Sequence, residues 1–385
     1  MMASLRKVLN VTLVILFLAA IWLPLASEML QIAPVIEVTE NRNLTSSPVF
    51  VLKKSELKKY PQRFENYFND HFGFRNMLVK WHNYLSYNWL KTSDRVLIGK
   101  DGWLFLARGV REDRRTIPIV ADRCGRAPFD DVELDKWVGA LEANWRAIDQ
   151  RNMEYLLVIV PNKHSVYPQY LPTQINCSSG GSRADQLGRG LQRLDGFPLL
   201  DLREAFIEQA KDSEPLFRQT DTHWDGHGIV VAYQAMMSGI DVEDVIDAGR
   251  VTLKEVGAPG GDLARLLGME RALTERAYGL RIKPVRAQRA VNPFPELTKD
   301  PSRQPAAREQ QDSDLPRLMV FHDSFVGNSV KNLLSESFSR SVFVWQGGPE
   351  LSMSLIDREK PDIIIHEMVE RNLLNPYFAT RHTDR

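Results

Sequence analysis

Three residues of the sequence have types and spacing suited to nucleophilic catalysis: Asp221, His223 and Ser324. A serine hydroxyl attacks an ester only when a neighbouring base takes its proton, and histidine suits that role because its pKa lies near neutral pH. A carboxylate on the other ring nitrogen fixes the tautomer and stabilises the imidazolium. Asp221 and His223 are two residues apart, so in an extended segment their side chains leave on the same side. The pattern allows acyl transfer, although an Asp-x-His and an Asp-Ser pair also occur by chance in chains of this length.

The elements that would position these residues belong to an α/β fold. Apolar runs predict strands at 155–160, 198–202, 318–321, 341–345 and 362–366, and amphipathic spacing predicts helices at 130–150, 184–194, 226–237 and about 326–334. The run 155–160 is continuous rather than alternating, which is typical of a strand buried on both faces of a parallel sheet. Strands that alternate with helices indicate an α/β fold with a mainly parallel sheet.

Ligands in open α/β sheets bind at the carboxyl ends of the strands, so polar residues after apolar runs are the ones that can form a site. Segment 162–164 follows one predicted strand, segment 322–325 follows another, and segment 221–224 precedes a predicted helix. Ser324 is expected at the top of its strand and at the N-terminus of the next helix. Backbone N–H groups and the helix dipole at such a position favour a developing negative charge.

Other segments of the sequence predict structure away from this site. Helices are expected over 57–72 and 76–90, and a strand–turn–strand unit is expected over 96–106. The segment 282–317 is rich in Pro, Arg, Gln and Asp. We expect it to be a surface insertion or mobile loop.

The N-terminus contains a segment that can cross a membrane. Residues 8–25 carry no charge and have about the minimum length for a hydrocarbon core of ~30 Å at ~1.5 Å rise per residue. Two basic residues precede it, so the positive-inside rule keeps residues 1–7 in the cytoplasm and exports the rest. A cleaved signal peptide is the alternative, since small residues follow the apolar run. We expect an uncleaved anchor, a linker over 26–54 and an exported domain over 55–378.

Composition and charge exclude several classes of protein. The chain has 385 residues, 43% of them hydrophobic, which excludes a disordered protein and supplies a sizeable core. Lys and Arg together number 49, as do Asp and Glu, so the chain lacks the basic excess of nucleic-acid binders. Its two cysteines, Cys124 and Cys177, cannot form a thiolate zinc site. In an exported domain they could form a disulfide, and two unrelated buried thiols are the alternative.

A series of motifs, in order over nearly all of the exported part, resembles one known family. The motifs are 39–44 (TENRNL), 64–70 (FENYFND), 72–75 (FGFR), 99–105 (GKDGWLF), 160–163 (VPNK), 221–224 (DTHW), 323–325 (DSF) and 369–373 (VERNL). Each is modest alone, but together they form a specific signal. The chain resembles the SGNH-hydrolase-like sugar O-acetyltransferases of the alginate type, the AlgJ/AlgX family.

The resemblance implies a fold, a mechanism and partners. It implies an SGNH-type three-layer sandwich with a mainly parallel central sheet, and a triad of Asp221, His223 and Ser324. It implies O-acetylation of an exported polysaccharide through an acetyl-serine intermediate, with a multi-pass membrane O-acyltransferase that relays the acetyl group. The expected location is the inner membrane of a Gram-negative bacterium, with the catalytic domain in the periplasm. The short C-terminal tail makes the AlgJ type, which lacks a C-terminal carbohydrate-binding module, the closer likeness.

The sequence departs from the family at one position beside the serine. His322 stands where the family often has glycine. Its side chain either narrows the approach of the backbone to the substrate oxyanion or points into the sheet. The departure concerns the rate more than the class of reaction.

Further side chains near the motifs are candidates for substrate contact. Lys163 either contacts substrate or supports the active-site loop. Arg371 either binds a polysaccharide carboxylate bidentately or pairs with a neighbouring acid. Trp224, like Trp103, either stacks on a sugar or belongs to the core. Asn328 is a candidate second oxyanion donor.

Other functions use the same residues differently. Asp221, His223 and His227 could be imagined as metal ligands, but a hydrolytic zinc site usually takes two histidines and a third ligand, and Asp-x-His already has a use. We expect neither metal nor cofactor, and we expect His164 to be structural. An acetyl esterase would use the same triad with water as the acceptor. A non-catalytic scaffold that binds polysaccharide is the alternative from a different class.

Overall fold

The computed structural model of the chain describes residues 2–30, 45–90, 93–110, 116–175, 177, 181–211, 214–240, 242, 245–311 and 314–375. The chain forms two compact units, Met1–Ser93 together with Ala264–Glu270, and Asp94–Leu263 together with Arg271–Arg385. The exported domain expected over 55–378 spans parts of both units, and residues 376–378 lie outside the described residues.

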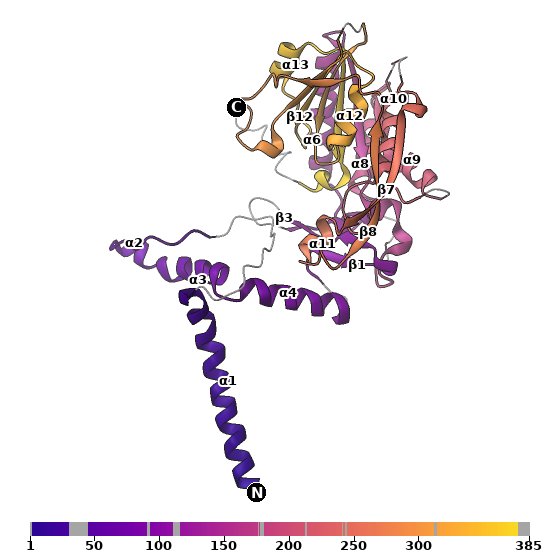
Figure 1. The fold of residues 1–385 in the computed structure, drawn as a ribbon. Coiled ribbons are helices and arrows are strands. Elements are labelled where there is room, and N and C mark those ends of the chain that lie inside the picture. Colours follow the sequence, from indigo (N-terminus) through magenta and orange to yellow (C-terminus); the bar gives the residue numbers. More distant parts are fainter. Residues whose placement is uncertain are drawn as a thin grey trace. The chain divides into compact units, whose positions relative to one another are not determined.

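The first unit is helical (Figure 1). Its elements are α1 (Met2–Leu30), α2 (Lys54–Leu57), α3 (Tyr60–His71), α4 (Arg75–Leu85) and a π-helical turn (Ser86–Leu90). The segment Arg6–Leu23 of α1 is long and apolar enough to cross a membrane. The two helices expected after the linker are confirmed, and they are separated at Phe74, which has a φ of 66°. Residues 31–44, about half of the expected linker and including the 39–44 motif, lie outside the described residues.

The second unit contains a seven-stranded sheet in the order β6-β5-β13-β11-β12-β10-β9. The strands are β6 (Leu199–Asp201), β5 (Glu154–Val160), β13 (Ile363–Val369), β11 (Arg317–His322), β12 (Arg340–Trp345), β10 (Ala306–Glu309) and β9 (Gln288–Ala290). The first five are mutually parallel, and β10 and β9 run antiparallel at one edge. This arrangement confirms the mainly parallel sheet.

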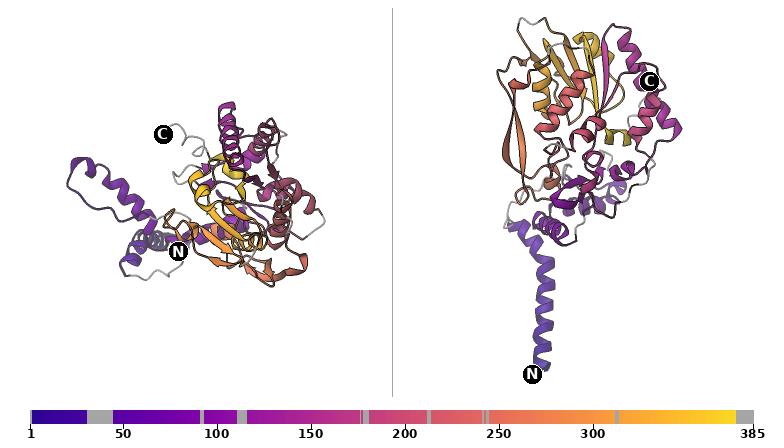
Figure 2. Two further views of the ribbon diagram at one scale, coloured as in Figure 1. Left: turned by 90° about the horizontal axis from the view of Figure 1, so that it is seen from above. Right: turned by 90° about the vertical axis from the view of Figure 1, so that its right-hand side faces the viewer.

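Helices cover both faces of this sheet (Figure 2). One core cluster joins the sheet to α9 (Leu202–Gln209), α10 (Gly226–Ser238) and α12 (Asn328–Ser335), and the other joins it to α6 (Asp131–Asp149), α8 (Arg183–Leu191) and α13 (Met353–Glu359). Along β5 the buried side chains alternate between the clusters, with Val158 in the first and Leu157 in the second. Each such side chain stabilises the fold by about 1.5–3 kcal/mol. The structure confirms the three-layer sandwich and the strand buried on both faces.

The edge strand β9 and its neighbour β10 lie where a surface insertion was expected. Both β9 and β10 belong to the segment 282–317, and β10 pairs with β12. Their residues, QRA and AARE, lack the apolar pattern of a buried strand because β9 buries no side chain and β10 buries only Ala307. The structure therefore corrects the expectation of a loop at residues 288–290 and 306–309, which are strands.

The remaining strands form small antiparallel pairs. They are β1 (Val96–Ile98) with β2 (Leu104–Leu106), β3 (Gly109–Val110) with β4 (Thr116–Ile117), and β7 (Val251–Pro259) with β8 (Thr274–Ile282). The pair β1–β2 confirms the strand–turn–strand unit expected over 96–106. The short helices of this unit are α5 (Ile119–Arg123), α7 (Lys163–Val166) and α11 (Asp262–Leu266), the last of which extends into the first unit.

The two cysteines form a disulfide, Cys124–Cys177, with a sequence separation of 53 residues. A cross-link that closes a loop of this length restricts the unfolded chain and contributes about 4 kcal/mol to stability. We therefore expect the double variant Cys124→Ser/Cys177→Ser to unfold at a lower denaturant concentration than the wild type. Adding dithiothreitol to the wild type should reproduce that shift and should leave the double variant unchanged. Equal midpoints for the oxidised wild type and the double variant would contradict this expectation.

Candidate active site

The loop that carries the first two candidates, residues 217–224, is closed at its base. Phe217 and Trp224 form an isolated antiparallel bridge. The next residue, Asp225, is the N-cap of α10, and its carboxylate also accepts the Tyr278 N–H of β8 at 2.7 Å. The base of the loop is thus attached to a core helix and to the β7–β8 hairpin.

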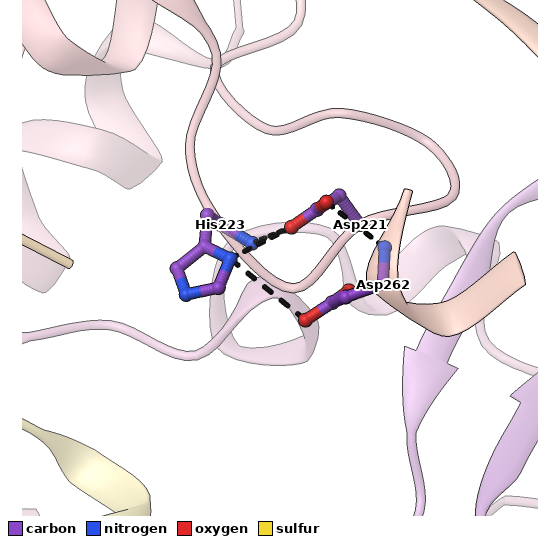
Figure 3. A group of neighbouring side chains, drawn as sticks. All are labelled: Asp221, His223 and Asp262. Atoms are coloured by element: carbon purple, nitrogen blue, oxygen red, sulfur yellow. Dashed lines mark hydrogen bonds and ion pairs between the residues drawn. The ribbon is translucent and has the colours of Figure 1, made fainter. Parts of the chain in front are cut away.

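Asp221 and His223 are joined within this loop (Figure 3). Asp221 Oδ1 lies 2.7 Å from His223 Nδ1 and also accepts the His223 backbone N–H at 3.0 Å. Burial by itself would raise the pKa of Asp221, but the hydrogen bond and charge of His223, with backbone N–H donors, hold that pKa well below its usual range. Asp221 is therefore an acceptor for a proton on Nδ1, which leaves Nε2 as the basic nitrogen of the ring.

A second carboxylate, Asp262, lies beside the same ring nitrogen (Figure 3). Its Oδ2 is 3.8 Å from His223 Nδ1, and its backbone N–H donates to Asp221 Oδ2 at 3.0 Å. Thr222 donates its N–H and its hydroxyl to the Asp262 carboxylate at 2.7 and 2.5 Å. Asp262 thus orients both Asp221 and the loop. The sequence analysis did not single out Asp262, because Asp262 follows strand β7 and no apolar pattern predicts that strand.

Gly261 allows the segment before α11 to approach the loop. A Cβ atom at this position would meet Asp221 Cβ at 2.4 Å and Asp221 Oδ2 at 2.5 Å. The Gly261 N–H also donates to Thr220 Oγ1 at 2.8 Å. Only glycine lets the backbone come this close, so the Gly-Gly-Asp sequence before α11 was the signal available for Asp262.

Lys163 supports the loop by hydrogen bonds to its backbone carbonyls. It is 4% exposed, and its Nζ donates to the carbonyls of Arg218, Gln219 and Asp221 at 2.9, 2.9 and 2.6 Å. Burial lowers the pKa of Lys163 to about 7, although the carboxylates of Asp262 and Asp221 oppose this shift. Of the two roles expected for Lys163, the contacts are those of loop support.

Replacing Lys163 with methionine should therefore destabilise the protein. Three part-buried carbonyls lose their donor, at a cost of about 3 kcal/mol or more. The folded-state pKa of Lys163 is depressed from 10.5 to about 7, so the unfolded chain binds the extra proton between these values and the contribution of Lys163 to stability rises with pH in that window. Urea unfolding at pH 7 and pH 9 should show this rise in the wild type relative to Lys163→Met. The exposed Lys136→Met is the control, and a stability loss as small as that of the control would contradict the role.

Ser324 follows strand β11 in a turn that Asp323 holds. Asp323 Oδ1 accepts the Phe325 N–H at 3.0 Å. Its Oδ2 accepts the Val369 N–H at 2.8 Å and the side-chain amide of Asn372 at 2.7 Å. The residue before the serine therefore ties the turn to the end of the neighbouring strand β13.

Two buried side chains flank this turn. His322 is 1% exposed, and its ring lies 6.3 and 5.8 Å from those of Phe343 and Trp345 on β12. Burial lowers the pKa of His322 to about 3, so it is neutral. Glu367 accepts the Asp323 N–H at 2.9 Å, and burial together with the Asp323 charge raises its pKa well above the usual value. His322 therefore points into the sheet region, the second of the two orientations considered.

Phe325 connects the serine turn to the histidine loop. Its ring lies 5.0 Å from the His223 ring and 5.1 Å from the Trp224 ring, and the Arg371 guanidinium lies 5.1 Å from its centroid. Consecutive Cα atoms are about 3.8 Å apart, so Ser324 belongs to the segment that packs on the imidazole. In the described part of the chain His223 Nε2 is buried without a hydrogen-bond partner, so no hydrogen bond joins it to the serine.

The helix after the serine starts later than expected. α12 begins at Asn328 with Gly327 as its N-cap, so Ser324 lies in the turn before the helix rather than in its first turn. The hydrogen bond from the Phe325 N–H to Asp323 forms a separate turn there. Asn328 is exposed at the helix start, and the described residues give it no hydrogen bond to the site.

Trp224 and Arg371 have different surroundings. Trp224 is 6% exposed and stacks on Phe206 at 5.8 Å, so the structure places it in the core rather than on a sugar-binding surface. Arg371 is half-buried and donates from Nη1 to Asn162 Oδ1 at 3.2 Å. Within the described ranges it makes no ion pair, so most of its guanidinium donors remain available.

The donor atoms of Asp221, His223 and Asp262 lie within 4.8 Å of one another, close enough to be tested as a metal site. The set offers one imidazole and two carboxylates. His223 Nδ1 is hydrogen-bonded to Asp221, and both Asp262 oxygens accept hydrogen bonds. His227, the other ligand considered, packs its ring against Tyr278 at 4.4 Å instead. These contacts favour a hydrogen-bonded acid–base pair over a zinc site.

Two curated relatives of the chain carry the same name. The chain is 25% identical over 299 residues to the probable alginate O-acetylase AlgJ of Pseudomonas aeruginosa, a match of 72% of this chain and 70% of the relative. It is 31% identical over 179 residues to the probable alginate O-acetylase AlgJ of Pseudomonas putida, a match of 46% of this chain and 42% of the relative. Among solved structures, PatB1 of Bacillus cereus has a TM-score of 0.51 at 16% identity, covering 74% of this chain and 99% of PatB1. This likeness supports the fold.

A family model decides the membership. The model described as "SGNH hydrolase-like domain, acetyltransferase AlgX" matches residues 96–355, about two thirds of the chain. The chain belongs to this family. The matched range contains the Asp-Thr-His-Trp loop, Asp262 and Ser324. The resemblance to the AlgJ/AlgX family and the SGNH-like fold are therefore confirmed.

Proposed function

We propose that the protein is an O-acetyltransferase that places acetyl groups on hydroxyls of an exported polysaccharide, alginate or a related exopolysaccharide. The observation that carries the proposal is the hydrogen bond from His223 Nδ1 to Asp221, with Nε2 unpartnered in the described structure beside the segment that contains Ser324. Membership of the AlgX family and two relatives named probable alginate O-acetylase support the same reaction class.

The reaction proceeds by two displacements on Ser324. In the first, the Ser324 hydroxyl attacks the carbonyl of an acetyl ester while His223 Nε2 takes its proton. The tetrahedral intermediate collapses, the donor alcohol leaves with that proton, and the acetyl group stays on the serine. In the second, His223 takes the proton of a sugar hydroxyl, which attacks the acetyl-serine. The serine oxygen leaves and receives the proton back.

The charges of the site match these steps. Asp221, held ionised by its donors, stabilises the imidazolium that forms twice in each cycle. The Phe325 N–H is already donated to Asp323, so the Ser324 N–H is the backbone donor that we assign to the oxyanion. Arg371, with most of its donors available, is the side chain that we assign to a polar group of the substrate.

The apolar helix supports the proposed location of the protein. The segment Arg6–Leu23 anchors the protein in the inner membrane, and the domain acts in the periplasm. Acetyl-CoA is absent outside the cytoplasm, so a membrane O-acyltransferase must relay the acetyl group across. An anchored domain stays beside that partner.

The test follows the fate of the acetyl group. The full chain in detergent micelles is incubated with a chromogenic acetyl ester, with and without an oligosaccharide acceptor. Ser324-dependent colour release and acetyl groups recovered on the oligosaccharide would support the transferase. Release of acetate alone would identify an esterase, and no Ser324-dependent turnover would overturn the enzymatic proposal.

A further inference from the structure

A cavity of about 500 Å³ lies in the second unit, and none of the three residues of the triad lines it. Strands β8, β9 and β10 and helix α12 form it, and its lining includes Ile282, Gln288, Arg289, Arg308, Ser329 and Asn332. This volume is within the range of small-molecule and sugar-sized ligand sites. The cavity combines apolar walls with polar and cationic side chains.

The two arginines of the cavity face each other without an acid between them. Arg289 and Arg308 are directly opposite in the β9–β10 register. Like charges at such positions destabilise a sheet. Neither guanidinium makes a hydrogen bond or ion pair within the described residues, and Arg308 Nε is buried without a partner. Burial and the Arg289 charge lower the pKa of Arg308, and the charge of Glu336 opposes this shift without reversing it.

The acid that lines the cavity is already used. Glu336 is 2% exposed and pairs with Arg250. It also accepts the N–H groups of Arg286 and Ala287 at 3.1 Å. The Glu336 carboxylate thus accepts from Arg250 and from two backbone N–H groups, and it acts on Arg308 through its charge rather than through a hydrogen bond.

A third cation lies close to the arginines. Lys331 of α12 has its Nζ 5.7 Å from the Phe343 ring, and burial together with the Arg308 charge lowers its pKa to about 8. The neighbouring acid of β10, Glu309, is paired with Arg340 on β12 instead. The cavity thus has an excess of positive charge that an anion would offset.

We propose that this cavity binds a carboxylate of the acceptor polysaccharide, with Arg289 and Arg308 as the side chains that hold it. A guanidinium matches a carboxylate with two parallel hydrogen bonds, which a neutral sugar hydroxyl does not offer. The acceptor is then an acidic polymer that contains uronic acid, rather than a neutral glucan. This inference rests on the proposed acetyltransferase function, which makes a polysaccharide the acceptor. The two arginines of the cavity add the requirement that this polysaccharide carry carboxylates.

The chain connects the cavity to the active-site turn. Ser329 lines the cavity and follows Ser324 by five residues, so their Cα atoms are at most about 18 Å apart. One polymer chain of a few sugars can therefore have a carboxylate in the cavity and a hydroxyl near the serine. Binding there would fix which hydroxyl reaches the acetyl-serine.

The test measures binding without turnover. The full-length Ser324→Ala variant in detergent micelles is titrated calorimetrically with oligo-uronates, with neutral β-glucan oligomers of the same length, with a monomeric uronate and with inorganic phosphate. We expect the oligo-uronate to bind at least about tenfold more tightly than each of the other probes, and its affinity to fall as salt rises. Adding Arg308→Gln or Arg289→Gln should weaken its binding by about tenfold or more.

Arg281→Gln is the matched control. Arg281 is exposed on β8 between two residues that line the cavity, so its side chain leaves on the opposite side of the strand. The Arg281→Gln substitution removes the same charge as Arg308→Gln. Its binding should equal that of the parent, and Arg308→Lys should keep part of the affinity that Arg308→Gln loses. Equal binding of acidic and neutral oligomers, equal losses in Arg281→Gln and Arg308→Gln, or phosphate binding as tight as that of the oligo-uronate would overturn the proposal. Ester turnover by the chain with Ser324 intact tests the enzymatic function separately.

Discussion

Replacing Ser324 with alanine is expected to lower the turnover of an acetyl ester by about 10⁴-fold or more. The substitution removes the only hydroxyl that the account gives a nucleophilic role, while the turn around it remains. Asp323 accepts its three donors through its own carboxylate, so the backbone hydrogen bonds do not depend on the serine side chain. Initial rates with a chromogenic acetyl ester, measured on the full chain in detergent micelles, give the comparison.

The control for this variant is another serine of the same unit. Ser238 lies at the end of α10, is exposed, and donates its hydroxyl to the Gln234 carbonyl at 2.9 Å. Ser238→Ala should keep the wild-type rate. A rate for Ser324→Ala within tenfold of the wild type, at an unchanged melting temperature, would rule out Ser324 as the nucleophile.

Replacing Asp221 with asparagine should have the next largest effect, about 10³- to 10⁴-fold on kcat. The amide keeps the shape of the side chain but no longer requires a proton on His223 Nδ1 and no longer stabilises the imidazolium. Asp262→Asn should cost less, because Asp262 Oδ2 is 3.8 Å from Nδ1 whereas Asp221 Oδ1 is 2.7 Å from it. If Asp262→Asn proved the more damaging of the two, Asp262 would be the acid of the triad.

Asp221→Asn should also change how the free energy of unfolding depends on pH. The folded-state pKa of Asp221 is depressed, so its contribution to stability is present above the unfolded-state value of about 3.9 and is lost as pH falls through the folded value. The difference in free energy of unfolding between the wild type and Asp221→Asn should therefore be present at pH 5 and shrink below about pH 3.9. Urea unfolding at several pH values measures it. A difference that grows in acid would contradict the depressed pKa.

The sequence predicted the parts of the fold whose signals are local. Five parallel strands and the helices on both faces follow from apolar runs and amphipathic spacing, because a strand covered on both faces must be apolar throughout. The edge strand β9 and its neighbour β10 bury few side chains and have no such requirement, so the sequence predicted a loop there. The β7–β8 hairpin was not predicted for a similar reason, since most of β7 is exposed.

The candidate site divides in the same way. The Asp221–His223 contact could be predicted because the two residues are neighbours in one loop. The contact of Asp262 with this pair could not be predicted, because the chain brings Asp262 to the site through the β7–β8 hairpin. The role of Gly261 is seen only where its backbone packs against Asp221. The role of Lys163 in holding three carbonyls also depends on a distant loop returning to β5. For Trp224 the sequence left a core position and a sugar-stacking surface position as alternatives, since an aromatic residue beside a helix start is compatible with either.

The most direct test of the account is to label the nucleophile covalently. Phenylmethylsulfonyl fluoride reacts with an activated serine by forming an oxygen–sulfur bond and releasing fluoride, and the adduct does not turn over. Intact-protein mass spectrometry followed by peptide mapping should find a single adduct on Ser324, formed much more slowly in His223→Ala and in Asp221→Asn. An adduct on another residue, or labelling of Ser324 at an equal rate in all three proteins, would contradict the proposed triad.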